Sequence, residues 1–269
     1  MTLAQRLLPL ALLSIASHYS QAAGSGSIER YATGVAPVSA TATFASQYIW
    51  RGIRQSDGRP AAQLSLDYRH PGGWSAGTWA SSIGDRAVDD GWLEWDVYGG
   101  YSGSTAAGIG YSAMAYYYMY PSARVGGDGR RYDYGEMAAG LSYKAVYARY
   151  YRTYTRDFFG IPDARGTGYL DVGVKRAIGD AMTLNIHAGD ARVGGTGNAG
   201  MDWHDVKAGL SRKFEGGWAL SGTYSRAFGA GSNGAFDRYA SAMPRTDLRP
   251  LSGSKSRSGA VVMTLSRRF

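Results

Sequence analysis

Apolar and polar side chains alternate along most of the chain. Within one segment, Leu93 and Trp95 alternate with Glu94 and Asp96. This period of two indicates a β-strand whose two faces meet different surroundings. The pattern recurs in about twelve segments, most of them near the ~9–11 residues that a tilted strand needs to cross a bilayer. The predicted strands are 38–51, 61–70, 73–83, 93–102, 105–118, 132–143, 145–154, 168–178, 181–190, 202–214, 217–227 and 259–269.

The connections between these segments alternate between short and long. An up-and-down barrel places every second connection at the same end, and outer-membrane barrels have short turns on one side and long loops on the other. A soluble β-sandwich, the alternative, has no reason to separate connection lengths in this way. We therefore expect an all-β fold, a transmembrane antiparallel up-and-down β-barrel of about 12 strands. The short connections are 71–72, 103–104, 144, 179–180 and 215–216, and the long ones are 52–60, 84–92, 119–131, 155–167, 191–201 and 228–258.

The N-terminus has the features of a secretory signal. Arg6 precedes a short apolar run at 7–16, and small residues follow at 20–23. A positive end, an apolar centre and a cleavage-like site are typical of a signal peptide, although a buried N-terminal helix is an alternative. We predict a signal peptide at 1–23, a flexible leader at 24–36 and the barrel at 37–269.

The last strand also fits a membrane barrel. Val261, Met263, Leu265 and Phe269 share one face, and Phe269 is the final residue. We interpret Phe269 as an insertion signal read by the barrel assembly machinery; a buried edge strand is the alternative. Aromatic residues near the strand ends predict girdles at headgroup level rather than core packing. They are Trp50, Tyr68, Trp74, Trp95, Tyr101, Tyr143, Trp218 and Tyr224.

Composition narrows the function. The absence of cysteine excludes a disulfide scaffold and a thiolate zinc site. The formal net charge is +8, but Lys and Arg are scattered without a basic helix, so we expect no nucleic-acid partner. Loop arginines instead suit the phosphates of outer-membrane lipid and lipopolysaccharide, because the guanidinium donates paired hydrogen bonds. These are Arg54, Arg59, Arg124, Arg130, Arg131, Arg156, Arg165, Arg238, Arg245 and Arg249.

The sequence offers little support for catalysis. Of four histidines, His18 leaves with the signal, His70 sits in a Pro-Gly turn and His204 begins a strand. No G-x-S-x-G element accompanies His187, and no metal or phosphate motif is present. We expect neither enzymatic activity nor a cofactor or metal site. A hydrolase that depends on His187 is a third, weaker hypothesis.

One stretch resembles a known family. The segment 48–63 reads YIWRGIRQSDGRPAAQ and is followed by Asp67-Tyr68, and the block 94–101 reads EWDVYGGY. These blocks resemble those of the TorF family of porin-type proteins, of the Gcw_chp type. The resemblance implies an outer-membrane barrel with a porin role. The basic charge balance and the Gly-rich loops at 126–129 and 194–200 depart from the family, so no substrate preference is carried over.

If the apolar face of each strand meets lipid, the polar face lines the interior. A mid-bilayer Arg or Lys on the lipid face costs about 2–4 kcal/mol, so parity assigns the charged positions inward. They form either a narrow polar path for small hydrophilic solutes or a plug of salt bridges. The main alternative function is a non-conducting barrel with a structural or interaction role, with 228–258 as its contact loop. The predicted lumen-lining residues are Arg51, Asp67, Glu94, Asp96, Glu136, Arg149, Asp171, Lys175, His187, Asp205 and Lys207.

Overall fold

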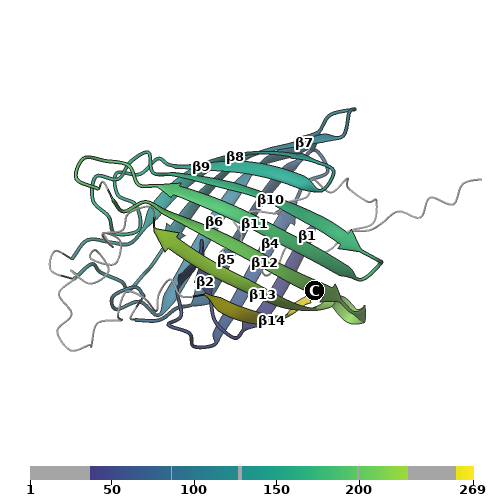
Figure 1. Cartoon of the computed structure of the whole chain (residues 1–269), viewed down its shortest axis with the longest axis horizontal. Helices are drawn as coiled ribbons and strands as arrows, with labels where there is room; N and C mark the ends of the chain where they lie inside the picture. Colours follow the sequence, from purple (N-terminus) through teal and green to yellow (C-terminus); the bar gives the residue numbers. More distant parts are fainter. Residues whose placement is uncertain (1–36, 86, 127–128, 199, 230–258) are drawn as a thin grey trace, which may run out of the picture.

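Twelve antiparallel strands form a closed barrel in the computed structural model, which describes residues 37–85, 87–126, 129–198, 200–229 and 259–269 (Figure 1). Each strand pairs with its neighbours along the chain, and β1 closes the barrel by pairing with both β4 and β14. The predicted fold class is confirmed. The barrel strands are β1 (Val38–Ala45), β4 (Ala61–Arg69), β5 (Trp74–Ser82), β6 (Leu93–Ser104), β7 (Ile109–Met119), β8 (Tyr134–Tyr143), β9 (Val146–Thr153), β10 (Gly168–Ile178), β11 (Met182–Arg192), β12 (Trp203–Lys213), β13 (Trp218–Gly229) and β14 (Ala260–Arg268).

The barrel is polar inside and apolar outside. On β4, Leu64 and Leu66 are 63% and 51% exposed, whereas the alternating residues Gln63, Ser65 and Asp67 are buried. Burial of apolar side chains stabilises a protein in water, so this inversion indicates that another apolar medium covers the outer face. Within the described residues, no helix has the length and apolar character to cross a membrane.

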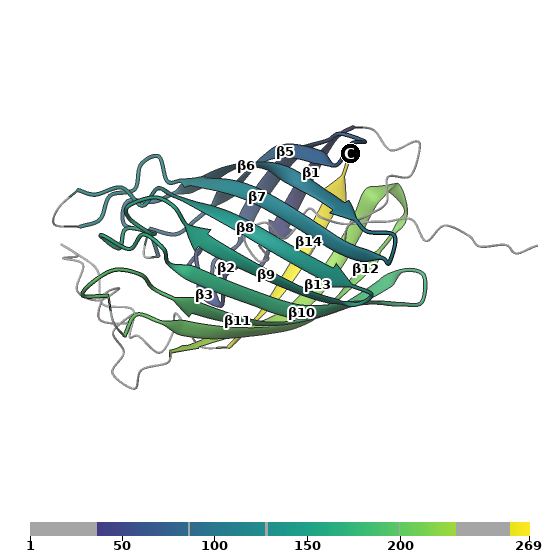
Figure 2. The ribbon, with the colours of Figure 1, turned by 90° about the horizontal axis from the view of Figure 1, so that it is seen from above.

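Connection lengths separate between the two ends of the barrel. Figure 2 shows tight turns at one end and longer, irregular connections at the other. The turn between β8 and β9 is two residues long and begins at Lys144, whose φ is 53°. The predicted alternation of short and long connections is therefore present over the described part of the chain. The predicted signal and leader (1–36) and most of the predicted contact loop (230–258) lie outside the described residues.

The predicted strand boundaries are wrong most clearly at two connections. The first strand ends at Ala45 rather than at residue 51, and the chain then forms a separate small hairpin of β2 (Ile49–Trp50) and β3 (Ile53–Arg54). The turn expected at 103–104 lies at 105–108, because β6 continues through Ser104. In the first case, alternation continues across a point where the backbone turns sharply, so the pattern concealed the break.

Candidate functional site

The connection 46–60 folds into the barrel. Its β2–β3 hairpin turns at Arg51 and Gly52, whose φ angles are 45° and 80°. A two-residue hairpin turn of this kind needs positive φ at both positions. A Cβ on Gly52 would lie 2.7 Å from the Cβ atoms of Asp205 and Ala227, so the hairpin tip fits tightly against β12 and β13. Arg51 reaches the interior from this loop and not, as predicted, from the first strand.

The guanidinium of Arg51 is buried at the centre of a polar and aromatic cage. Its Nη1 and Nη2 atoms donate to the two carboxylate oxygens of Glu136 on β8, at 3.1 and 2.7 Å. Three ring centroids lie close to its Cζ, those of Trp50 at 4.5 Å, Tyr151 at 5.0 Å and Tyr169 at 4.1 Å. Burial by itself lowers the pKa of Arg51, but the charge and hydrogen bonds of Glu136, together with Tyr134 and Tyr118, more than reverse this, so the pKa lies above its usual value. The guanidinium of Arg51 therefore remains positively charged inside the barrel.

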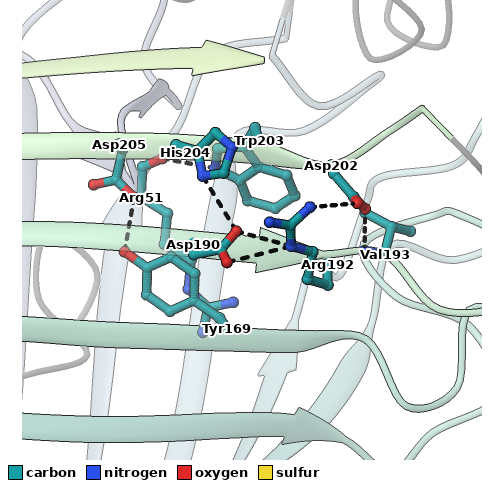
Figure 3. Close-up of polar contacts among 9 residues, drawn as sticks. All are labelled: Arg51, Tyr169, Asp190, Arg192, Val193, Asp202, Trp203, His204 and Asp205. Atoms are coloured by element: carbon teal, nitrogen blue, oxygen red, sulfur yellow. Dashed lines mark hydrogen bonds and ion pairs between the residues drawn. The ribbon is translucent and has the colours of Figure 1, made fainter. Parts of the chain in front are cut away.

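A further hydrogen bond ties the hairpin to β12. The indole Nε1 of Trp203 on β12 donates to the backbone oxygen of Arg51 at 3.0 Å. In Figure 3, Trp203 and Tyr169 lie beside Arg51, and Tyr169 also points to Asp205. The loop is thus held by its backbone, its guanidinium and its close fit at Gly52.

A second cluster surrounds His187 on β11. Its Nδ1 lies 2.6 Å from Asp171 Oδ1 and its Nε2 lies 2.7 Å from Asp205 Oδ2. The hydroxyl of Tyr169 donates to the other oxygen of Asp205 at 2.8 Å. Both ring nitrogens can donate only when the imidazole is protonated, so this geometry suits an imidazolium between two carboxylates. All four side chains are buried.

The remaining acidic residues lie on β4 and β6. Asp67 accepts hydrogen bonds from Ser65 at 3.0 Å and from Tyr98 at 2.7 Å. Glu94 accepts one from the hydroxyl of Tyr120 at 2.9 Å. Tyr120 follows β7, and burial raises its pKa well above its ordinary value, which keeps this hydroxyl protonated. Asp96, in contrast, has no hydrogen-bond partner for either carboxylate oxygen among the described residues.

The basic residues lie on other strands. Arg149 on β9, Lys175 on β10 and Lys207 on β12 are partly buried at alternate positions that face inward. In the barrel order, β10 to β12 lie opposite β4 to β6, and β9 adjoins β10. One side of the interior is therefore acidic. The side that faces it carries acidic residues as well as these three basic residues.

The interior is filled more completely at the long-loop end. Trp50, Tyr134, Phe158 and Trp203 are buried there, and Trp50 packs within 6.5 Å of the other three ring centroids. Toward the short-turn end many of the inward side chains are small, polar and only partly buried. Examples are Ser75, Ser102, Ser142, Asn185 and Ser211. The hairpin and its aromatic surroundings are therefore the most densely packed group of rings in the described interior.

The aromatic predictions had one clear failure. Trp50 was assigned to a membrane girdle but is buried inside the barrel at 3% exposure. Most of the others lie on the outer face, and Trp74, Trp95 and Trp218 are at least 40% exposed. Trp203, Tyr169 and Gly52, which shape the hairpin's environment, were not predicted. The adjacent Arg-Gly pair between apolar residues was the one local signal for a tight turn.

Outside the barrel wall, His204 belongs to a separate polar cluster. Its Nδ1 lies 3.2 Å from Asp190, and Arg192 contacts both Asp190 and Asp202 at 3.0 and 3.2 Å (Figure 3). His204 and Asp190 are direct cross-strand partners on β12 and β11. These are partly exposed ion pairs, and such pairs typically contribute little to stability. Within the described residues, no group of three or more His, Asp or Glu side chains is arranged to hold a metal.

An apolar outer face, a polar interior and an inward-folded loop define a porin-type barrel architecture. Comparison with solved structures gives the same fold. A KdgM porin chain aligns with a TM-score of 0.50 and 7% identity, over 86% of this chain and 98% of that chain. A KdgM porin in complex with disordered oligogalacturonate aligns with a TM-score of 0.49 and 8% identity, over 86% and 98%. OccD3 (OpdP) of Pseudomonas aeruginosa aligns with a TM-score of 0.41 and 11% identity, over 87% and 65%.

The family follows from the sequence match. Residues 29–242 match the family described as "Bacterial protein of unknown function (Gcw_chp)", and the chain belongs to this family. The Gcw_chp part of the resemblance is thereby confirmed, whereas the TorF designation stays a prediction. No curated protein matches the chain.

Proposed function

We propose that this protein is an outer-membrane porin that lets small hydrophilic solutes pass through a narrow, charged interior. The observation that carries the proposal is the inverted barrel, closed by pairing of β1 with β14 and lined by ionisable residues. Only a closed barrel can cross a bilayer with strands, because an open edge would leave backbone groups unpaired in lipid. The aligned KdgM porin supports the fold and not the choice of solute.

The inward-folded loop makes the proposed path narrow. The Arg51–Glu136 pair and the packed rings occupy the long-loop half, while small polar side chains line the short-turn half. Solutes would meet the 46–60 loop as the main constriction. The predicted lumen-lining set would act through its field, with Asp67, Glu94 and Asp96 facing Arg149, Lys175 and Lys207 across the barrel.

The proposal includes the membrane partners. Exposed aromatic residues at the strand ends suit headgroup level, and Phe269, at the C-terminus, would serve as the insertion signal for the barrel assembly machinery. Lipopolysaccharide contact is a weaker part of the proposal. Arg59, Arg131 and Arg156 are exposed as predicted but form ion pairs with loop aspartates, and Arg54 is only partly exposed. The predicted Arg238, Arg245 and Arg249 lie outside the described residues.

A non-conducting barrel is the second candidate function. The aromatic packing around Trp50 and the triple anchoring of the hairpin favour it, because together they fill the interior at one end. In this alternative the interior charges serve stability and the loops serve interaction. We propose no enzymatic function in either case, since His187 is enclosed by two carboxylates and lies beside no serine nucleophile that the sequence identifies.

Single-channel recording distinguishes the two functions. Purified protein lacking residues 1–23 would be refolded in detergent and added to planar bilayers. Discrete conductance steps, with a reversal potential that depends on the salt gradient, support the porin. A folded and inserted protein that produces no steps contradicts it and supports the non-conducting barrel.

A further inference from the structure

Two neighbouring acidic residues on β6 lack the partners that the other interior carboxylates have. Glu94 and Asp96 are each 1% exposed. Glu136 pairs with Arg51, and Asp171 and Asp205 contact His187. By contrast, Glu94 meets only the hydroxyls of Tyr48 and Tyr120, and both oxygens of Asp96 accept no hydrogen bond from the described residues. A buried carboxylate without a partner is costly, so these oxygens call for a proton or a cation.

Aromatic side chains flank the two carboxylates on the neighbouring strands. The direct cross-strand partners of Asp96 are Trp79 on β5 and Tyr118 on β7. Tyr134 on β8 is next in the same row and stacks on Tyr118 with ring centroids 4.5 Å apart. Trp79 Nε1 and the Tyr134 hydroxyl are buried and unpartnered among the described residues. Unpartnered polar atoms on β5 and β8 therefore belong to residues in the same cross-strand row as Asp96.

The inward-folded loop covers this place. Tyr48 precedes β2 and meets the Trp79 ring edge-on at a centroid distance of 5.6 Å. Its backbone oxygen accepts from the amide of Gln55, and the backbone oxygen of Gln55 accepts from the amide of Gly84. A solute approaching from the long-loop end would therefore pass the 46–60 loop before it reached Glu94 and Asp96.

We propose that Glu94 and Asp96 form a binding site for the primary ammonium group of a small solute. An ammonium offers three N–H donors, which suit the unpartnered oxygens of Asp96 and Tyr134 and the carboxylate of Glu94. The faces of aromatic rings attract the same charge. A metal ion fits less well, because the described residues supply no group of three metal-ligating side chains. The inference rests on the proposed function, since the solute reaches the site through the lumen.

The test measures binding without requiring conductance. Calorimetric titration of refolded, detergent-solubilised protein with n-butylammonium chloride should show saturable binding. Asp96→Asn and Glu94→Gln keep the side-chain shape and should each weaken binding about tenfold or more, the usual effect of losing a hydrogen bond to a charged group. The matched control is Asp180→Asn, because Asp180 is exposed in the turn between β10 and β11, and its variant should bind like the parent. Tetramethylammonium, which has no N–H, should bind more weakly.

Three results would overturn the site. They are no saturable heat with the parent protein, equal binding by Asp96→Asn, or binding of calcium chloride that is lost in Asp96→Asn while n-butylammonium has no effect. Heat-modifiable migration in gels would confirm that the variants are folded. Failure of the site is separable from failure of the proposed function. A protein that produces no conductance steps but binds n-butylammonium supports the site and contradicts the porin function. A protein that conducts but does not bind n-butylammonium supports the porin function and contradicts the site.

Discussion

Arg51 donates two hydrogen bonds to Glu136, a residue 85 positions later in the chain and on a distant strand of the barrel. The pair joins a loop to the opposite wall, so it spans the interior instead of stabilising a single sheet edge. Both side chains are almost fully buried. This contact is one of three restraints on the 46–60 loop, beside the Trp203 hydrogen bond and the close fit at Gly52.

Replacing Arg51 with Ala should open the interior. Removing one member of a buried ion pair costs about 3–5 kcal/mol, because the other charge is left unpaired. We expect lower thermal stability and larger conductance steps in planar bilayers than for the parent protein. The control is Arg59→Ala, on the same loop, whose side chain is 61% exposed and pairs at the surface. Equal conductance of parent and Arg51→Ala would show that the loop does not limit the path.

Gly52→Ala should dislodge the hairpin tip. Gly58 is the matched control, because it lies in the same loop with φ of 76° against 80° for Gly52. In both alanine variants the left-handed backbone conformation lowers the free energy of unfolding by about 1–3 kcal/mol. Only at Gly52 does the added Cβ also meet the Cβ atoms of Asp205 and Ala227 at 2.7 Å. Thermal unfolding should show a larger loss for Gly52→Ala, and an equal loss would contradict the tight fit.

The His187 cluster should make stability depend on pH. Asp171 and Asp205 accept from the protonated ring, while Tyr169 on β10 and Lys207 on β12 are the other groups that face it. Stability from this contact is present when the imidazole is protonated and is lost as rising pH removes one donor. The unfolding temperature should therefore fall as the pH rises, and His187→Gln should make the unfolding temperature less dependent on pH. His70→Gln, in an exposed turn, should retain it; a parent profile without an alkaline decline would argue against the imidazolium.

Charges on the outer face should impair insertion. Leu66→Arg places a cation on the apolar face, where Arg costs about 2–4 kcal/mol at the bilayer midplane. Ser142→Arg is the inward-facing control at a partly buried polar position on β8. Refolding into phosphatidylcholine vesicles, followed by gel migration, should show lower yield for Leu66→Arg only. Similar yields for both variants would contradict a lipid-facing exterior.

Much of the fold could be predicted because barrel strands carry their information locally. On β4 and β14 each residue alternates between lipid-facing and interior sides, so Leu64 and Asp67, or Val261 and Thr264, reveal their faces without knowledge of any partner. Parity also placed Glu94, Glu136, Asp171 and Asp205 on the buried face, although their proposed role in solute passage stays a prediction.

The alternating pattern of the sequence was enough to determine the strands, their two faces and the separation of short from long connections. Only the tertiary structure decided that 46–60 turns inward, that Arg51 meets Glu136, and that Asp96 lies between Trp79 and Tyr118 without a hydrogen-bond donor. The physical reason is the separation along the chain of the residues that determine each feature. Side-chain alternation is a property of adjacent residues, whereas the interior contacts depend on which strands barrel closure brings opposite one another and on how deeply a loop can pack between them.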